Sequence, residues 1–290
     1  MKGLSLYVRS LSKKRHGSPN AFAAKCRDHG LSWVALGGPW QKKRKGTLWI
    51  NSVAEIHKYG DALAAFGVTP YVWGYPHIGQ EEDFARAMAK AAKWGHLLLD
   101  PEVSVNPWKA RSGPRLTQVK AHPDKILREL VTRRQYETIG LSSYGSAARI
   151  RWFPLVEYIR AMIKHHPGLK FVGGQTYVDD DNIDKSIDEY IKATRDAGGT
   201  VVTSFDAPSA SNVFIVPNYG LYRWNTKRRT RFSWAKKKTR VELRAHLYEF
   251  INNEEPVEGM IGWAENFASP ALWDELKRFS GMMRRGACKV

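Results

Sequence analysis

Short apolar segments alternate with amphipathic segments along the whole chain. The apolar segments, which we expect to be strands, span residues 4–8, 32–36, 70–75, 96–99, 138–144, 169–177, 200–205 and 259–264. The amphipathic segments, which we expect to be helices, span residues 21–29, 53–66, 81–94, 123–134, 153–165, 183–197, 241–252 and 270–279. Regular alternation of this kind is typical of a parallel sheet. Gly30, Gly67 and Gly95 follow helical segments, where glycine accepts the left-handed backbone that ends a helix.

Eight units of strand and helix predict an α/β fold, namely a closed (β/α)8 barrel. Such barrels typically need about 250 residues in one domain, which agrees with a chain of 290 residues. A doubly wound open sheet is the alternative, but it needs no eighth unit, and no glycine-rich phosphate motif follows the first strand. We therefore predict a single barrel domain over residues 1–290, with a long basic and aromatic insertion at 211–240 after the seventh strand.

Four carboxylic acids lie at predicted strand ends, where barrel enzymes carry their catalytic groups. They are Asp100 and Glu102 after the fourth strand, Asp206 after the seventh and Glu265 after the eighth. Side chains two residues apart on a strand share a face, which would place the first two acids roughly 7 Å apart. Carboxylic acids at such a separation can divide acid and base work on a glycosidic bond. Alternatively, Asp100 caps a helix or pairs with Lys109 or Arg111.

The environments of these acids suggest different roles. Glu102 is the candidate general acid, because desolvation beneath aromatic walls would keep it protonated. Asp100 would stay ionised and either stabilise positive charge at the anomeric carbon or orient Glu102. Glu265 could act as the partner base or nucleophile, with Asp206 as the weaker alternative. The acids at 179–181 are interpreted mainly as the first turn of the following helix, where negative charge is favourable.

The predicted barrel mouth is rich in aromatic and amide side chains. Flat apolar sugar faces stack on indoles and phenols, while sugar hydroxyls need polar partners, so this composition suits carbohydrate better than a phosphorylated metabolite. Each aromatic residue could alternatively just fill the barrel. The candidate substrate-binding residues are Arg9, Trp40, Trp73, Tyr75, His77, Tyr144, Gln175, Tyr177 and Trp263.

Several of these segments resemble known families. The strand that ends in Asp100-Pro101-Glu102 and the aromatic strand Tyr71–Pro76 before it resemble the (β/α)-barrel muramidases among phage and bacterial cell-wall lysins. A group of phage and prophage glycoside-hydrolase-like proteins is similar in three further segments, which are Gly140–Gly145, Trp152–Pro154 and Gly174–Tyr177. The resemblance covers roughly residues 3–279.

The resemblance implies a barrel that acts on bacterial peptidoglycan, with the family's Asp-X-Glu pair on Asp100 and Glu102. The muramidases also carry an aspartate on the first strand, where this chain has Arg9. That departure leaves open a barrel that binds glycan without cleaving it. The main alternative is therefore a non-catalytic virion or tail protein, which would use the same groove for attachment or for assembly with other virion proteins.

The charge of the chain indicates an anionic partner. Lys and Arg number 46 against 28 Asp and Glu, which gives a formal net charge of +18 and a pI near 9.9. Basic runs at 13–15, 42–45 and 227–240 follow the first, second and seventh predicted strands, and therefore fall in loops on the catalytic rim. A positive rim concentrates polyanions, although each run could also be a solvated loop. Cell wall with peptide carboxylates and teichoic phosphates fits, as does nucleic acid.

The insertion at 211–240 keeps a nucleic-acid-binding barrel as a third candidate. Its interleaved arginine and aromatic residues could stack bases, but the chain has no helix-turn-helix, zinc-finger or RNA-recognition signature. The insertion could equally be a lid or a docking arm.

Cofactor, metal and membrane roles have little support in the sequence. Cys26 and Cys288 indicate neither a disulfide framework nor a zinc site, and we predict no cofactor. The first residues are typical of a strand rather than a secretory signal, and no apolar run is long enough to span a bilayer. We expect cytoplasmic synthesis without membrane insertion, followed by release on lysis or delivery within a virion.

Overall fold

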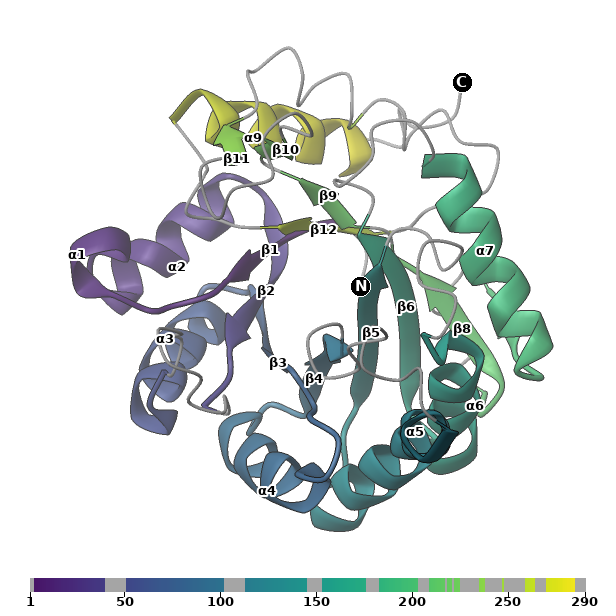
Figure 1. Ribbon diagram of the computed structural model, residues 1–290. Coiled ribbons are helices and arrows are strands. Elements are labelled where there is room, and N and C mark those ends of the chain that lie inside the picture. The colour runs from purple at the N-terminus through teal and green to yellow at the C-terminus, as the bar shows by residue number, and fades with distance from the viewer. Residues whose placement is uncertain are drawn as a thin grey trace.

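The computed structural model describes residues 3–39, 51–101, 113–144, 153–175, 183–202, 209–216, 218–220, 222–224, 235–237, 247, 259–263 and 270–284. Strands occupy the centre of the molecule and helices surround them (Figure 1). None of the helices in these ranges is both long and apolar enough to cross a bilayer.

The observed elements follow the predicted alternation. The strands are β1 (Gly3–Val8), β2 (Leu31–Gly37), β3 (Thr69–Gly74), β4 (His96–Leu99), β5 (Thr138–Tyr144), β6 (Leu169–Gln175), β7 (Thr200–Val201), β8 (Asn212–Ile215), β9 (Asn218–Gly220), β10 (Tyr222–Trp224), β11 (Ala235–Lys237) and β12 (Gly259–Trp263). The helices are α1 (Lys13–His16), α2 (Pro19–Asp28), α3 (Val53–Ala65), α4 (Glu81–Ala91), α5 (Gly113–Arg133), α6 (Leu155–His165), α7 (Ile183–Asp196) and α9 (Pro270–Arg284).

Parallel pairings close the strands into a ring. The order around the ring is β1, β2, β3, β4, β5, β6, β9 and β12, and β12 pairs with β1. This ring confirms the predicted (β/α)8 fold. It also brings the carboxyl ends of all its strands to one rim, because every pairing is parallel.

The seventh position of the ring lies later in the chain than we predicted. Of the strand predicted at 200–205, Thr200 and Val201 form the short strand β7, which pairs with β8. The strands that pair with β6 are instead β8 and β9, which lie in the segment that we assigned to the insertion. Burial explains the difference, because a barrel strand is covered on both faces. Val213 and Ile215 pack in the core between strands and helices, and Phe214 packs inside the barrel. Thr200, by contrast, is exposed.

Each strand has one face toward the helices and one toward the barrel axis. In β3, Val72 packs in the outer core, while Tyr71 and Trp73 belong to a separate inner cluster. The buried members of that inner cluster are Tyr7, Trp33, Ala35, Tyr71, Trp73, Leu98, Phe171, Phe214 and Val216. Large aromatic rings therefore fill the barrel and leave its rim as the place for chemistry.

Local signals fix most helix ends. Ser52 and Glu55 form a capping box at the start of α3, and Gly30, Gly67 and Gly95 have positive φ, as predicted. The helix α5 begins at Gly113, well before the predicted start at 123, and includes Pro123. Of the helix predicted at 241–252, Leu247 lies in the described part and is helical and buried.

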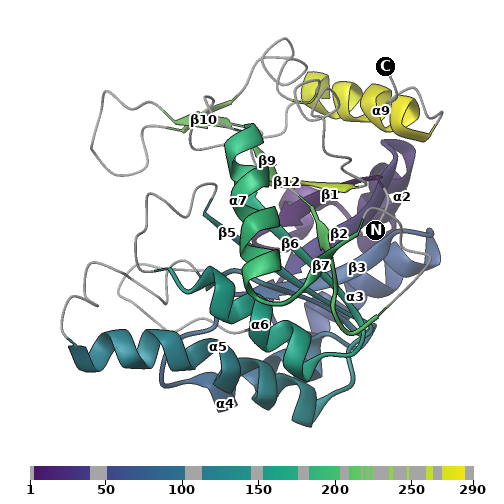
Figure 2. The same cartoon turned by 90° about the vertical axis from the view of Figure 1, so that its right-hand side faces the viewer.

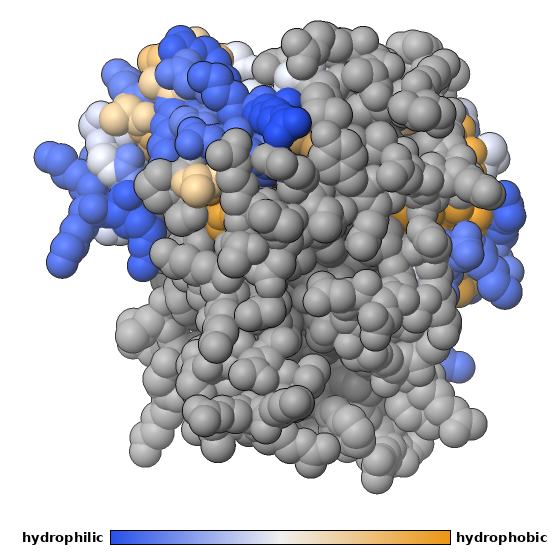
Figure 3. Space-filling model, turned by 90° about the horizontal axis from the view of Figure 1, so that it is seen from above, coloured by the Kyte–Doolittle hydropathy of each residue, from blue (hydrophilic) through white to orange (hydrophobic). Residues whose placement is uncertain are grey.

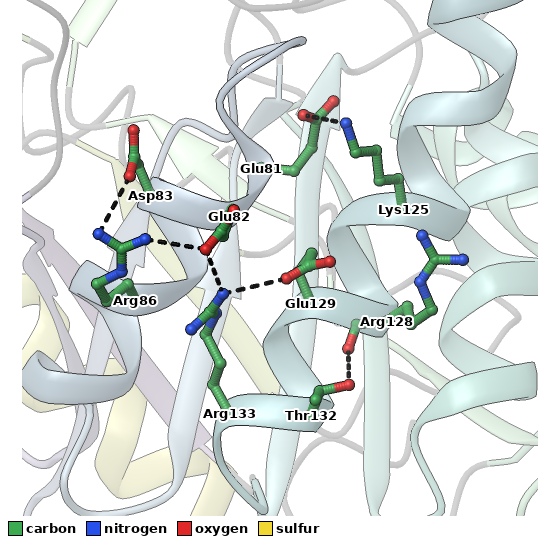
Figure 4. A network of polar contacts seen from close by, with 9 residues as sticks. All are labelled: Glu81, Glu82, Asp83, Arg86, Lys125, Arg128, Glu129, Thr132 and Arg133. Carbon is green, nitrogen blue, oxygen red and sulfur yellow. Dashed lines mark hydrogen bonds and ion pairs between the residues drawn. The ribbon is translucent and has the colours of Figure 1, made fainter.

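Ion pairs join α4 to α5 (Figure 4). Arg133 contacts Glu82 at 3.0 Å and Glu129 at 3.3 Å, and Glu82 also pairs with Arg86 at 2.9 Å. Exposed pairs of this kind each contribute little, about 0–1 kcal/mol, so buried apolar contacts hold the two helices together.

Two buried basic groups occupy the opposite face of the barrel, at the start of β6. Lys170 is fully buried and donates to the carbonyl oxygens of His166 at 3.0 Å and Gly168 at 2.7 Å. Burial lowers the pKa of Lys170 to about 8. Burial and the adjacent Lys170 charge together lower the pKa of His166 to about 4. The surroundings of His166 at this face of the barrel therefore favour its neutral form.

We predict that Gly140 is required by the ring of Phe171. A Cβ at Gly140 would overlap that ring inside the barrel. Gly140→Ala should lower the free energy of unfolding by about 1–3 kcal/mol, as expected for overpacking. In a Phe171→Leu background the same change should cost measurably less, because the overlapping ring is gone. Chemical denaturation of the four proteins of this cycle tests the coupling, and strict additivity would contradict it.

We predict that acid destabilises the fold partly through His166. The pKa of His166 in the folded protein lies below the ordinary value of 6.5. Between pH 6.5 and 4, His166 is therefore protonated in the unfolded chain but largely neutral in the folded protein. The free energy of unfolding should therefore fall as pH falls through this window, by on the order of 2 kcal/mol for this group. Denaturation at pH 7 and 4.5 should show a smaller loss in His166→Gln than in the wild type or in the control His57→Gln. Equal losses would refute the assignment.

Candidate functional site

A chain of aromatic rings runs along the inside of the barrel toward the rim. The rings of Tyr7 and Trp73 meet edge to face at 5.4 Å, and those of Trp73 and Tyr75 at 5.2 Å. The indole Nε1 of Trp73 donates to the carbonyl oxygen of Val8 at 3.2 Å, which ties β3 to the end of β1. Tyr7 and Trp73 are buried, whereas Tyr75 is partly exposed. Trp73 thus fills the barrel, and Tyr75 is the member of this row of aromatic rings that reaches the rim.

Asp100 lies at the rim, directly after β4. Its backbone N–H donates to the carbonyl oxygen of Gly74 at 2.9 Å, which continues the pairing of β3 and β4. Leu98, two residues earlier, packs in the inner cluster, so the strand geometry places Asp100 on the same inner face. The residue is fully buried. A carboxyl group covered in this way is suited to orienting a neighbour rather than to contacting a sugar itself.

Of the predicted acid pair, Asp100 belongs to the described part of the chain. The strand β4 ends at Leu99, and Pro101 already has 3₁₀-helical backbone. The expected separation of roughly 7 Å assumes extended backbone through Glu102 and stays a prediction. Glu102 itself lies outside the described residues.

Asn51 fastens two rim loops to each other. Its Nδ2 donates to the carbonyl oxygens of Gly37 at 2.7 Å and Arg9 at 3.2 Å, and its Oδ1 accepts from the Leu11 N–H at 2.7 Å. Asn51 is almost fully buried, and a Cβ at Gly37 would overlap the carbonyl oxygen of Arg9. Arg9, half-buried after β1, therefore has its backbone held in place from the loop after β2. Sequence analysis missed Asn51, and the capping box that follows it was the available signal.

Glu81 fixes the loop between β3 and α4, which carries Tyr75 and the half-buried His77. Its Oε1 accepts from the Gly79 N–H at 3.0 Å and contacts His122 Nδ1 at 2.8 Å, and its Oε2 pairs with Lys125 at 3.2 Å (Figure 4). Burial acts to raise the pKa of Glu81, but the hydrogen bonds from His122 and Gly79 outweigh it and lower the pKa to about 2. Sequence analysis missed this buried charge, which keeps the loop anchored to α5.

The remaining predicted residues divide into two groups. Tyr144, Gln175 and Trp263 are strand residues at the rim, and the register pairs Tyr144 with Gln175. Outside the described residues lie Trp40, Glu102, Tyr177, Asp206 and Glu265, together with the acids at 179–181. Across the described ranges, no three His, Cys, Asp or Glu side chains are grouped so that they could hold a metal ion.

Part of the predicted basic rim is present on the described surface. Lys13, Lys14 and Arg15 are exposed on α1, shortly after the carboxyl end of β1. Figure 3 shows hydrophilic side chains gathered over the side of the molecule on which α1, α2 and α9 lie. Exposed cations also project from the other two helices, namely Lys25, Arg27, Lys277 and Arg278.

Comparison with known proteins bears on the fold. No protein-family model matches this chain, and no curated protein is similar to it in sequence. Active domain 2 of a thermostable chitinase from Pyrococcus furiosus has a similar structure, with a TM-score of 0.59, 11% identity and coverage of 99% of this chain and 96% of that chain.

Two further structures show the same likeness. The spore cortex-lytic enzyme SleL of Bacillus megaterium has a TM-score of 0.51 at 13% identity, with 96% of this chain and 74% of that chain covered. A phospho-2-dehydro-3-deoxyheptonate aldolase from Thermotoga maritima has a TM-score of 0.52 at 9% identity, with 99% and 69% covered. These likenesses show the barrel fold, and the different reactions that the names imply mean that the fold alone does not define the chemistry.

We predict that Asn51→Ala destabilises the protein by about 2–4 kcal/mol, because buried groups left without a hydrogen bond cost about 1–3 kcal/mol each. Chemical denaturation measures the effect. Asn20→Ala, at an exposed position on α2, is the matched control and should change stability by less than about 0.5 kcal/mol. Similar values for the two variants would show that Asn51 does not hold the rim loops together.

Proposed function

We propose that this protein is a glycoside hydrolase that acts on bacterial cell-wall peptidoglycan. The observation that carries the proposal is the buried carboxyl group of Asp100 at the carboxyl end of β4, on the barrel face lined by aromatic rings. Barrel enzymes place their chemistry at this end of the strands. Paired carboxylic acids at a barrel mouth are the groups that glycosidic bond cleavage uses.

The burial of Asp100 refines the roles that we assign to the acids. Glu102 is the general acid that protonates the leaving oxygen. Asp100 is a positioning residue, because it is covered by protein rather than open to a sugar. If the two acids lie side by side, an ionised Asp100 would raise the pKa of Glu102 and keep its proton on near neutral pH. Glu265, two residues after β12 in the sequence, is the candidate base or nucleophile, and Asp206 is the weaker alternative.

The sugar would lie against the outer end of the aromatic chain. Tyr75 offers a partly exposed ring, and Trp73 supports it from inside the barrel. Arg9 and His77, both half-buried at the rim, would donate to hydroxyl or carboxylate oxygens of the glycan. The same role is proposed for the other residues that the sequence places at strand ends, which are Trp40, Tyr144, Gln175, Tyr177 and Trp263.

Three observations support cell wall as the substrate. The Asp-X-Glu strand and the aromatic strand before it resemble cell-wall muramidases. The structures of similar fold include a chitinase and a spore cortex-lytic enzyme. The formal net charge of +18 suits an anionic polymer better than a neutral glycan.

A non-catalytic attachment protein is the second candidate. Arg9 stands where the muramidases have an aspartate, and Asp100 is fully buried. Both features would suit a barrel that binds glycan on a virion without cleaving it.

Turbidity loss and release of reducing ends from purified cell walls test the proposal. Glu102→Gln should lower the rate by at least about 100-fold, as expected for loss of a general acid. Asp100→Asn should lower the rate less and move the alkaline limb of the pH–rate profile to lower pH, because a neutral amide no longer raises the pKa of Glu102. Glu137→Gln, at an exposed position directly before β5 and therefore at the amino ends of the strands, is the control and should retain activity.

The outcomes separate the candidates. Wild-type activity in Glu102→Gln would remove that residue from the mechanism. Tight binding of walls by the wild type, with no release of reducing ends at any pH, would favour the attachment protein. An unchanged pH profile in Asp100→Asn would leave that residue a purely structural role.

A further inference from the structure

The chain folds back on itself as a two-stranded ribbon after it leaves the barrel wall. The strands β10 and β11 pair antiparallel in a sheet of their own, with Tyr222 opposite Lys237, Arg223 opposite Lys236 and Trp224 opposite Ala235. Figure 2 shows β10 beyond the carboxyl end of β9, on the side toward which the barrel strands run. Gly220 ends β9 and Tyr222 begins β10, so the ribbon is rooted at the catalytic rim.

The ribbon belongs to a stretch of unbalanced positive charge. Residues 207–241 contain nine Lys and Arg and neither Asp nor Glu, which equals half of the formal net charge of +18. The nine are Arg223, Lys227, Arg228, Arg229, Arg231, Lys236, Lys237, Lys238 and Arg240. Arg223 stands directly opposite Lys236, and like charges at opposed positions destabilise an antiparallel pair. Since this stretch contains no Asp or Glu, a bound anion would supply the counter-charge that its own sequence lacks.

The root of the ribbon adjoins the strands that carry proposed glycan-binding residues. The strand β9 pairs with β6 at Gln175 and Asn218, and with β12 at Trp263 and Gly220. A polymer that lies along the ribbon therefore reaches the barrel mouth at the ends of β6 and β12.

We propose that the β10–β11 ribbon binds the phosphodiester groups of an anionic polymer that is attached to the wall glycan. This inference rests on the proposed function, because it makes the glycan in the barrel mouth and the phosphates on the ribbon parts of one substrate. Arginine binds phosphate through paired N–H donors, and a row of cations engages successive phosphates. Nucleic acid would satisfy the ribbon alone, whereas a phosphate-bearing wall polymer accounts for both the ribbon and its place at the mouth.

The test compares two variants of equal charge change in the full-length protein. The ribbon variant is Arg223→Gln/Lys236→Gln/Lys237→Gln. The control variant is Lys58→Gln/Lys90→Gln/Lys120→Gln, which removes three exposed cations from α3, α4 and α5. Both should keep the wild-type melting temperature, because β10 and β11 pair with each other and with no described barrel strand.

Binding is measured by co-sedimentation with purified walls across a range of salt concentrations. The walls are used intact and after hydrofluoric acid has removed their phosphodiester polymers. Wild type and control should bind intact walls alike, and the ribbon variant at least about tenfold more weakly. Its slope of log binding against log salt should fall by about 2, because each cation on a single-stranded polyanion releases about 0.7 counterions. Stripped walls should reduce the wild type to the level of the ribbon variant.

Each result that differs from these expectations would have a different meaning. Equal wall binding by the ribbon and control variants, or undiminished binding of the wild type to stripped walls, would overturn the proposal. Loss of retention on double-stranded DNA in the ribbon variant, with wall binding unchanged, would assign the ribbon to nucleic acid instead. If the wild type binds phosphate-bearing walls through the ribbon but releases no reducing ends, the proposed hydrolysis fails while the ribbon assignment stands.

Discussion

Closure of the strand ring by β9 is the constraint on which the rest of the structure depends. Without a strand between β6 and β12, two rows of backbone N–H and C=O groups would face each other unpaired, which is costly in a buried sheet. The pairings of β8 and then Asn218 of β9 with β6, and of β9 with β12, cover those edges. The same closure brings the carboxyl ends of distant strands to one rim. Any site that combines residues of β4 with residues of β12 depends on it.

Filling of the barrel decides how deep that site can be. The rings of Tyr7, Trp33, Trp73 and Phe171 occupy the interior, so ligand chemistry is confined to the layer above them. Asp100 is buried two residues after Leu98, a member of this inner cluster. Because Asp100 is buried, it can orient a neighbouring group but cannot contact the substrate directly. The proposed general acid is therefore Glu102.

Long-range polar contacts hold the rim, and these were the hardest part of the site to predict. Asp100, Arg9, Tyr75 and His77 could be placed from sequence, because a strand end is visible as the point where an apolar run stops. Asn51 and His122 lie about forty residues from their partners in the chain, in loops and helices whose local sequence does not reveal a contact. Their role follows from burial, since an enclosed polar side chain must find hydrogen bonds wherever the fold brings a partner.

The amino-acid sequence alone determined the alternation of strands and helices and the glycine-terminated helix ends, because these depend on contacts within a few residues, and the number of alternating units indicated the barrel class. Tertiary structure decided which apolar segment fills the seventh position. The segments 200–205 and 212–216 are both short and apolar, and pairing with β6 and burial on two faces selected the second. It also decided that Asp100 is buried, because the pairing of β3 with β4 continues to the Asp100 N–H and carries this residue into the covered end of the barrel.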